Sequence, residues 1–273
     1  MTAFPANPQA MFKNFWFYRS LIWQMSKREV AGRYRGSMMG LLWSFFNPVM
    51  MLAIYTFVFS VVFKAKWGGT ASESKMEFAT ILFAGMIVYN LFAECISRAP
   101  NLILGNVNYV KKVVFPLDIL PWVSLCAALF HQLISLAVLT LFYAAINQSL
   151  NWTVLFFPLL MLPLIFMIMG ASWVLASVGV FLRDVTQTTG LLLTIMMFVS
   201  PIFYPTSALP ERFQAVMLLN PLTFIVEQAR DVLIWGKLPD FSGLLVYFAA
   251  SLGIAFLGFA WFQKTRKGFA DVI

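Results

Sequence analysis

The feature that most constrains this chain is a series of long apolar runs, most of which contain no charged residue. A helix needs about 20 predominantly apolar residues to cross the hydrocarbon core of a membrane. Because the runs are continuous and lack the alternation of membrane-barrel strands, they predict helices. We expect six membrane-spanning helices, near residues 38–63, 79–98, 119–146, 153–182, 187–205 and 242–263.

The composition excludes a water-soluble domain. Residues of the AVILMFWYC set make up 61% of the 273 residues, while Asp, Glu, Lys and Arg together make up 11%. Soluble proteins contain about 25% charged residues, and a domain of this size needs them for its water-facing surface. The predicted fold class is therefore all-α, with a single transmembrane domain over residues 1–273 whose six-helix bundle occupies 38–263.

The basic residues are unevenly distributed between the two sides of such a bundle. If the N-terminus is cytosolic, 13 of the 19 Lys and Arg residues fall on the cytosolic side. The positive-inside rule predicts this bias, which explains the net charge of +8 without a nucleic-acid partner. We therefore expect both termini to be cytoplasmic. The six basic residues left on the outer side are Lys64, Lys66, Lys75, Arg212, Arg230 and Lys237.

Two segments outside the spans have their own pattern. Residues 1–34 carry aromatic and basic residues at helical spacing, which favours a helix in the headgroup plane, with a helix packed on a partner protein as the alternative. In 206–237, an apolar stretch of 216–226 is broken by Asn220-Pro221. Eleven residues cannot cross a core about 30 Å thick, so we expect a re-entrant or interfacial helix pair on the outer side.

The chain lacks the residues that common catalytic or metal chemistry requires. No G-x-x-x-x-G-K-[ST] loop is present, and a single histidine, His131, cannot form a histidine-based metal site. His131 either lines a pathway or is satisfied by a neighbouring helix. Glu94 precedes Arg98 by four residues, a spacing that favours a structural ion pair over an ion site. We predict no catalytic residue, no metal and no cofactor in this chain.

Aromatic residues are abundant, with 29 Phe, 9 Trp and 8 Tyr. Most are accounted for by lipid-facing Phe and by interfacial belts of Trp and Tyr. An alternative concerns aromatic residues near the outer ends of the spans, which would line a passage where the C–H faces of sugars stack on the rings. These residues are Trp67, Tyr89, Phe198, Phe203 and Tyr204.

Several motifs together resemble the permease subunit of type-2 ABC exporters of bacterial polysaccharides, the group that exports O-antigen and teichoic acid. The likeness covers residues 19–273 in family order, and the capsule-type branch is more distant than the O-antigen branch. The motifs are Lys27-Arg28-Glu29, Arg33-Tyr34-Arg35-Gly36-Ser37, NYVKKVVFPLDILP at 108–121, FLRDVTQ at 181–187, SPIFYP at 200–205, LPE at 209–211, NPLT at 220–223 and KGFADV at 267–272.

The resemblance implies a separate ATP-binding cassette subunit that binds ATP and Mg²⁺, with the 106–118 loop as the helix that couples the two subunits. Alternatives stay open, because the loop lysines also fit plain positive-inside topology and Arg183-Asp184 also fits a local salt bridge. The residues expected at this interface are Lys111, Lys112, Val114, Phe115, Pro116, Asp118, Arg183, Asp184, Arg28, Arg33 and Arg35.

The resemblance also implies that 206–237 forms re-entrant gate helices at the exit, although a fixed amphipathic lid is an alternative. The family acts as a homodimer with two ATPase subunits, so the polymer path would lie between two copies. Besides the five aromatic residues, the expected path and gate residues are Pro205, Glu211, Asn220, Pro221, Glu227 and Arg230.

The predicted function is therefore that of a permease subunit in the bacterial inner (plasma) membrane. It would export lipid-linked O-antigen or a related polysaccharide for lipopolysaccharide biosynthesis. The same fold exporting teichoic acid, capsule or a drug is an alternative. An ion-coupled secondary transporter predicts intramembrane carboxylates and repeated halves, neither of which is visible. An intramembrane enzyme would need convergent acid, base or metal groups.

Overall fold

The computed structural model describes residues 5–62, 67, 75–111, 115–217 and 219–273, and all regular elements in these ranges are helical. The α-helices are α1 (Pro8–Phe17), α2 (Arg19–Arg33), α3 (Leu42–Tyr55), α4 (Lys75–Arg98), α5 (Val107–Lys111), α6 (Leu120–Asn147), α7 (Phe157–Phe181), α8 (Val185–Val199), α9 (Glu211–Met217), α10 (Pro221–Leu233), α11 (Phe241–Thr265) and α12 (Phe269–Val272). A π-helix, η1 (Thr56–Val62), continues α3. Short 3₁₀ segments include η2 (Ala99–Asn101), η3 (Leu104–Asn106), η4 (Leu117–Ile119), η5 (Trp152–Phe156), η6 (Thr206–Ala208) and η7 (Arg266–Gly268).

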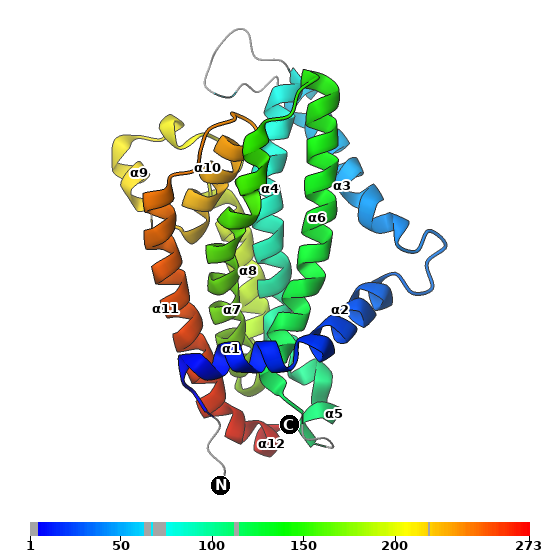
Figure 1. Cartoon of the computed structure of the whole chain (residues 1–273), viewed down its shortest axis with the longest axis vertical. Helices are drawn as coiled ribbons and strands as arrows, with labels where there is room; N and C mark the ends of the chain where they lie inside the picture. The colour runs from blue at the N-terminus through cyan, green and yellow to red at the C-terminus, as the bar shows by residue number, and fades with distance from the viewer. Residues whose placement is uncertain (1–4, 63–66, 68–74, 112–114, 218) are drawn as a thin grey trace.

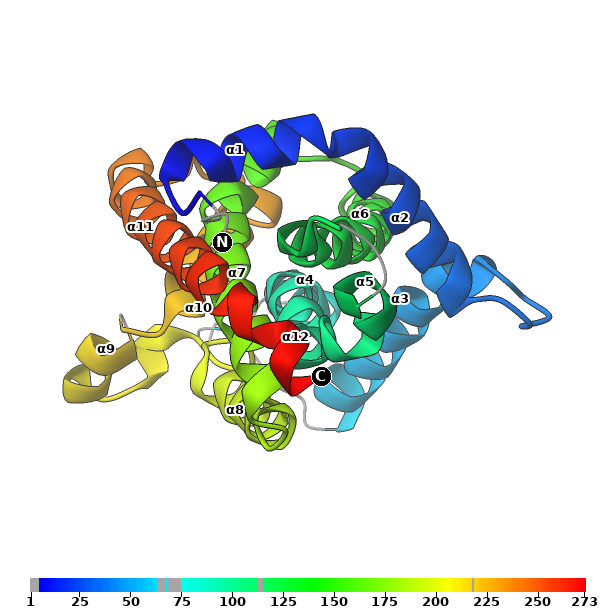
Figure 2. The same cartoon turned by 90° about the horizontal axis from the view of Figure 1, so that it is seen from below.

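The long helices form an upright bundle around α4. Figure 1 shows α4, α6, α7, α8 and α11 running along the long axis and α3 inclined to it, with both chain ends at the lower end. From below, α4 lies in the middle of the other long helices, and α1 and α2 wrap around one side (Figure 2). The burial of α4 agrees with this central position, because 83% of its apolar 18-residue stretch is buried inside the bundle. Helices α9 and α10 lie toward the opposite end from the termini.

Within the residues that the structure describes, five helical stretches are long and apolar enough to cross a membrane, at Leu42–Phe59, Glu77–Asn101, Leu117–Asn147, Trp152–Phe181 and Phe241–Val272. They correspond to five of the six predicted spans. The remaining prediction, 187–205, falls on α8, which has only 15 residues. It stops at Ser200, whose extended backbone (φ −74°, ψ 148°) is the conformation favoured before a proline, here Pro201.

The N-terminal segment also differs in detail from the prediction. Instead of one helix over 1–34, the described part forms two helices that meet at Tyr18. Asn7 caps α1 by accepting a hydrogen bond from the backbone N–H of Ala10 (3.2 Å), and Pro8 follows at the first helical position. The bend at Tyr18 lets α1 pass α11 while α2 runs along α6 (Figure 2).

Helices α7 and α11 pack extensively against each other, because a glycine on each helix faces the backbone of the other. A Cβ atom on Gly258 would lie 2.2 Å from the carbonyl oxygen of Gly170, and one on Gly170 would lie 2.5 Å from that of Ile254. Without side chains the two backbones approach each other, which is how helices gain packing energy where lipid competes equally for apolar surface.

We therefore expect Gly258→Ala to lower the stability of the bundle, because the new methyl group collides with backbone that cannot rotate away. The expected cost is about 1–3 kcal/mol. The measurement is thermal melting of the purified chain in detergent. Gly253→Ala is the matched control, since it lies on the same helix and its added Cβ meets no atom within 4 Å. Equal melting temperatures for the two variants would contradict this account of the contact.

Candidate functional site

A buried carboxylate joins four parts of the chain at the end that carries the termini. Asp118, in η4 at the end of the 106–118 loop, is 3% exposed. Its Oδ2 accepts a hydrogen bond from Asn14 Nδ2 of α1 (2.9 Å), and its Oδ1 lies 3.4 Å from Arg266 Nη1 of η7. Its backbone carbonyl accepts from Trp173 Nε1 of α7 (3.0 Å). The loop is thus fixed at this point to both termini and to the bundle.

Further contacts hold the same loop to the C-terminal segment. Arg266 Nη2 donates to the carbonyl of Phe115 (2.6 Å), and Lys111 Nζ donates to the backbone oxygen of Ile273 (2.6 Å). Within the loop, the Phe115 ring stacks on Tyr109 at 4.3 Å and 13°. Both ends of the loop are therefore braced by residues more than 140 positions away in the sequence.

Other residues predicted for this interface are placed as follows. Pro116 precedes η4, while Lys112 and Val114 lie outside the described residues. Arg183 and Asp184 are exposed in the turn between α7 and α8, at the same end of the bundle (Figure 1). Among the described contacts, no ion pair joins Arg183 to Asp184, so the local salt bridge is not formed.

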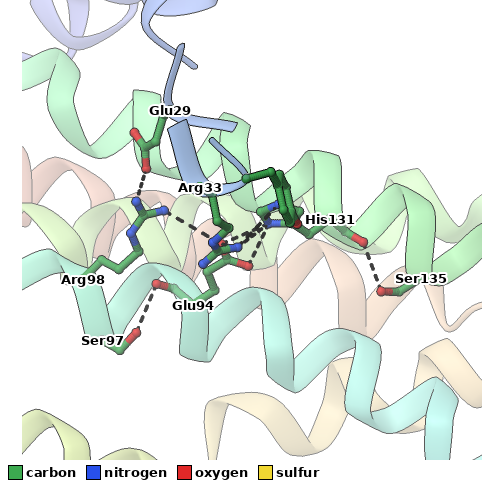
Figure 3. Close-up of polar contacts among 8 residues, drawn as sticks. Glu29, Arg33, Glu94, Ser97, Arg98, His131 and Ser135 are labelled. Carbon is green, nitrogen blue, oxygen red and sulfur yellow. Dashed lines mark hydrogen bonds and ion pairs between the residues drawn. The ribbon is translucent and has the colours of Figure 1, made fainter. Parts of the chain in front are cut away.

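The three arginines predicted near the N-terminus lie in different surroundings. Arg28 lines a hollow of about 280 Å³ together with Tyr109 and Asn106, which places it next to the 106–118 loop. Arg35 is exposed just beyond the end of α2. Arg33, in the last turn of α2, points to a cluster of charged side chains between α2, α4 and α6 (Figure 3).

Glu94 of α4 is the centre of this charged cluster. Its Oε1 lies 2.7 Å from Arg33 Nη1, 3.1 Å from His131 Nδ1 and 3.8 Å from Arg98 Nη1. Arg98 also pairs with Glu29 of α2. The predicted Glu94–Arg98 pair is present, but it is the longest of the ion pairs that Glu94 makes. His131 is satisfied by neighbouring helices, as the second alternative proposed.

Tyr34 completes the cluster on the side of α2. Its hydroxyl lies 3.1 Å from His131 Nε2. Burial raises the pKa of the Tyr34 phenol above its usual value, so the group stays protonated at neutral pH. The cluster borders a cavity of about 470 Å³ between α2, α3, α4, α6 and α8.

At the opposite end of the bundle, Arg230 of α10 is buried, with 1% of its surface exposed. Its guanidinium donates to three carbonyls: Nε to Ile81 (3.1 Å), Nη1 to Pro201 (2.6 Å) and Nη2 to Ile202 (2.7 Å). The guanidinium carbon lies 4.3 Å above the ring centre of Trp67. The charge is therefore compensated by carbonyl dipoles and a ring face.

The surroundings of Arg230 are shaped to fit it. Gly85 of α4 makes room for the side chain, because a Cβ there would lie 2.9 Å from Nη2. Burial lowers the pKa of Arg230 to about 9, and the nearby Glu227 carboxylate opposes this shift. The guanidinium hence stays charged at pH 7, where its full set of donors is needed.

Aromatic residues predicted to line a passage form part of a ring row. Phe198 stacks on Phe203 (5.8 Å), which stacks on Phe59 (6.0 Å). Phe59 stacks in turn on Phe78 (5.7 Å), which meets Trp67 (5.8 Å). The row runs from the exposed Phe198 to the buried ring beneath Arg230.

Among the described ring contacts, the other two aromatic residues predicted to line the passage, Tyr89 and Tyr204, do not stack on this row. Tyr89 is buried and donates to the carbonyl of Leu193 on α8 (2.8 Å), which places it in the wall of the 470 Å³ cavity. The Tyr204 hydroxyl donates to the carbonyl of Phe198 (3.0 Å), so it closes the turn that follows α8.

The polar residues predicted for the outer segment have local structural roles. Asn220 caps α10 by accepting from the N–H of Leu222 (2.9 Å), and Pro221 is the first helical residue. Glu227 accepts a hydrogen bond from Thr206. Of the remaining two predicted residues, Pro205 directly precedes η6 and Glu211 is the first residue of α9.

Sequence reasoning missed the partners of Asp118. Arg266 was counted only as a cytosolic charge and Asn14 only as part of an interfacial helix, although both contact the Asp118 carboxylate. A separation of 148 residues between Asp118 and Arg266 leaves no periodic signal. Glu29 belongs to the motif Lys27-Arg28-Glu29, but its position in the sequence does not indicate that it contacts Arg98.

The sequence matches a known family and several characterised proteins. Residues 20–234 match the family described as ABC-2 type transporter. The chain is 27% identical over 265 residues to the O-antigen export system permease protein RfbA of Myxococcus xanthus, covering 96% of this chain and 99% of that protein. It is 24% identical to RfbA of Klebsiella pneumoniae (95% and 97% covered). It is 22% identical to the polysialic acid transport protein KpsM of Escherichia coli (88% and 91% covered).

The substitution Arg230→Lys tests the three hydrogen bonds of the Arg230 side chain, because it keeps the positive charge and removes the guanidinium group. In Arg230→Lys, a single ammonium cannot reach three carbonyls on two elements, so buried acceptors are left unsatisfied. We expect a loss of about 2 kcal/mol or more in stability, measured by thermal melting in detergent. Arg212→Lys, at an exposed position on α9, is the control. A melting temperature for Arg230→Lys equal to that of the control would show that the fork of hydrogen bonds does not stabilise this end.

Proposed function

Because this chain belongs to the ABC-2 type transporter family, we propose that it is the permease subunit of an ATP-driven exporter of lipid-linked O-antigen or a related polysaccharide. Members of this family are membrane transport subunits, so the chain is not itself an enzyme. The relatives named O-antigen export permeases cover almost its whole length. The more distant match to a polysialic acid transporter supports a capsule-type polysaccharide as the second candidate cargo.

The energy for export would come from a separate ATP-binding subunit, where ATP and Mg²⁺ bind. The observation that carries this part of the proposal is the braced 106–118 loop. Asp118, Arg266 and Lys111 hold the loop against the bundle and the C-terminal segment. A loop held this way transmits a push from a docked ATPase to α6 and α7 instead of absorbing it. Arg28, beside the loop, and the exposed Arg183-Asp184 turn would extend the docking surface.

We infer six membrane crossings, with α8 as the shortest, and an N-terminal pair α1–α2 lying at the inner headgroup plane. Helix α1 supports this placement because Trp16 and Phe17 are exposed while Arg19, just after it, stacks on Trp16. The segment with α9 and α10 would be re-entrant on the outer side and act as a gate. Both termini would be cytoplasmic and the chain would lie in the bacterial inner membrane.

The polysaccharide path would lie between two copies of this chain, each with one ATP-binding subunit. The exposure of α3 supports a second copy of the chain as its packing partner, because only 17% of the apolar stretch Leu42–Phe59 is buried within one chain. The exposed Phe198, at the end of the aromatic row, would then face the path, where sugar rings stack on aromatic rings.

The direct test of the proposed function is to express the chain with the ATP-binding subunit encoded beside it. We expect the two to purify as one complex whose ATPase activity rises when lipid-linked glycan is added. Glycan species of the O-antigen and polysialic acid types would separate the two candidate cargoes. A chain that binds no ATP-binding subunit, or that moves solute when reconstituted alone, would contradict the proposal.

The braced loop predicts a coupling defect in Arg266→Met, because this change removes the contacts to the Phe115 carbonyl and to Asp118. We expect assembly with the ATP-binding subunit to persist, while glycan exported per ATP hydrolysed falls about tenfold. Phe115→Ala, which removes the stack on Tyr109, should act in the same direction. Lys267→Met, at the exposed neighbouring position, is the control and should export normally. Normal export by all three variants would remove the coupling role of the loop.

The inferred topology predicts which positions a membrane-impermeant maleimide reaches in intact spheroplasts. In a background where Cys95 and Cys126 are replaced by Ala, Leu219→Cys should react at once, since residue 219 is 83% exposed. Lys267→Cys should react only after the membrane is permeabilised. If Lys267→Cys reacted in intact spheroplasts and Leu219→Cys reacted only after permeabilisation, the termini would lie outside.

A further inference from the structure

The 470 Å³ cavity has a polar end and an apolar end. The charged residues Arg33, Glu94 and Arg98 line one end together with Tyr34 and His131, and the apolar residues Pro48, Met51, Phe83 and Leu193 line the other part. The uncharged polar residues Asn47, Asn90 and Ser135 also contribute to the wall. Its volume lies within the range of small-molecule sites. Arg98 is the last residue of α4, at the end that carries both termini, whereas Phe83 lies four turns deeper in the same helix. The cavity is therefore amphipathic along the direction in which a lipid lies in a membrane.

The two arginines at the polar end retain capacity for a ligand. Arg33 contacts Glu94 and His131 through Nη1, and its side chain is 43% exposed, so its other N–H groups can serve a further acceptor. Arg98 is 35% exposed and is held by Glu29 and Glu94. The carboxylates are more buried than the arginines, at 19% for Glu94 and 24% for Glu29. They act as internal counter-ions, and the two arginines are the more exposed charged groups at this end of the cavity.

A second hollow adjoins the polar end and leads toward the chain termini. It measures about 360 Å³ and shares Ser97 and Arg98 with the larger cavity. Its wall also contains Asn101, Asn106 and Glu29, together with the apolar Leu102. Polar groups thus continue from the lower end of the bundle to the cavity, with Arg98 at the junction.

We propose that this cavity binds the phosphate of a lipid headgroup between Arg33 and Arg98, with the apolar chain of that lipid along Met51, Phe83 and Leu193. Planar guanidinium groups bind phosphate through paired hydrogen bonds. Glu94 and Glu29 stay in place as counter-ions, and the phosphate accepts from the N–H groups of the two arginines that these carboxylates do not use. The inference deepens the proposed function, because this lipid would be the carrier to which the glycan is attached.

The test measures lipid binding to the full chain in nanodiscs of phosphatidylcholine by native mass spectrometry. The probe is a polyprenyl diphosphate, titrated against the wild-type chain and against Arg33→Gln and Arg98→Gln. We expect each variant to weaken binding about tenfold, the usual effect of losing a charge-assisted hydrogen bond. Arg19→Gln, on the same helix but outside the cavity, is the matched control and should bind as the wild type does.

Glu94→Gln separates a binding site from a purely structural ion-pair network. Removing the carboxylate frees both arginines, so binding of the probe should be unchanged or tighter. If the cluster only holds the helices together, Glu94→Gln will weaken binding as much as the arginine variants do, and the proposal is wrong. Melting temperatures of all variants show whether a loss of binding results from unfolding. The comparison of Glu94→Gln with the arginine variants remains informative, because the two explanations predict opposite effects of Glu94→Gln on binding.

Two further probes identify the source of the phosphate. Phosphatidic acid carries phosphate on two acyl chains, and inorganic diphosphate carries no chain. Arginine-dependent binding of either lipid supports the proposal, and the tighter of the two identifies the class of lipid. Inorganic diphosphate binding as tightly as the lipids would overturn it, because the apolar end would then contribute nothing. Since no ATP-binding subunit is present in this assay, its outcome is independent of whether the proposed complex forms.

Discussion

The buried carboxylate of Asp118 is the interaction on which one end of this molecule depends. It lies in low-dielectric surroundings, where an uncompensated charge is costly, and its compensation comes from Asn14 near the start of the chain and Arg266 near the end. Its backbone carbonyl binds Trp173 as well. The N-terminal helix, the 106–118 loop, α7 and the C-terminal segment consequently meet at one residue. A displacement of the loop changes the contacts of all three neighbours.

The membrane architecture follows closely from the sequence because hydropathy alone decides whether a helix can cross lipid. Five of the predicted spans agree with helices of spanning length, and the resemblance to ABC-2 exporters was confirmed at the level of the family. The boundaries that were missed depend on local geometry. Helix α8 stops at Ser200 because the following Pro201 disfavours helical backbone. The bend at Tyr18 has no comparable marker, since no proline or glycine stands there.

The charged residues were less predictable, because their partners lie far apart in the sequence. The pair of Glu94 with Arg98 could be expected from its helical spacing, whereas the shorter contact with Arg33 depends on how α2 packs along α6 and brings its last turn to Glu94. The sequence places Arg230 among the outer-side charges and among the expected path and gate residues, yet it is buried, because three carbonyls and the Trp67 ring surround it. Hydropathy assigns a charged residue to water, and only the fold reveals which charges are satisfied inside.

The shortness of α8 has a consequence for the surrounding bilayer. Fifteen residues at 1.5 Å each extend about 22 Å, which is less than a hydrocarbon layer about 30 Å thick. Hydrophobic mismatch of this kind is relieved by local thinning of the lipid. As the shortest of the six proposed crossings, α8 would make the neighbouring lipid tails compress and would bring the two water layers closer together along this side of the protein. A hydrophilic polymer leaving beside α8 would meet the narrowest dielectric barrier that the membrane offers.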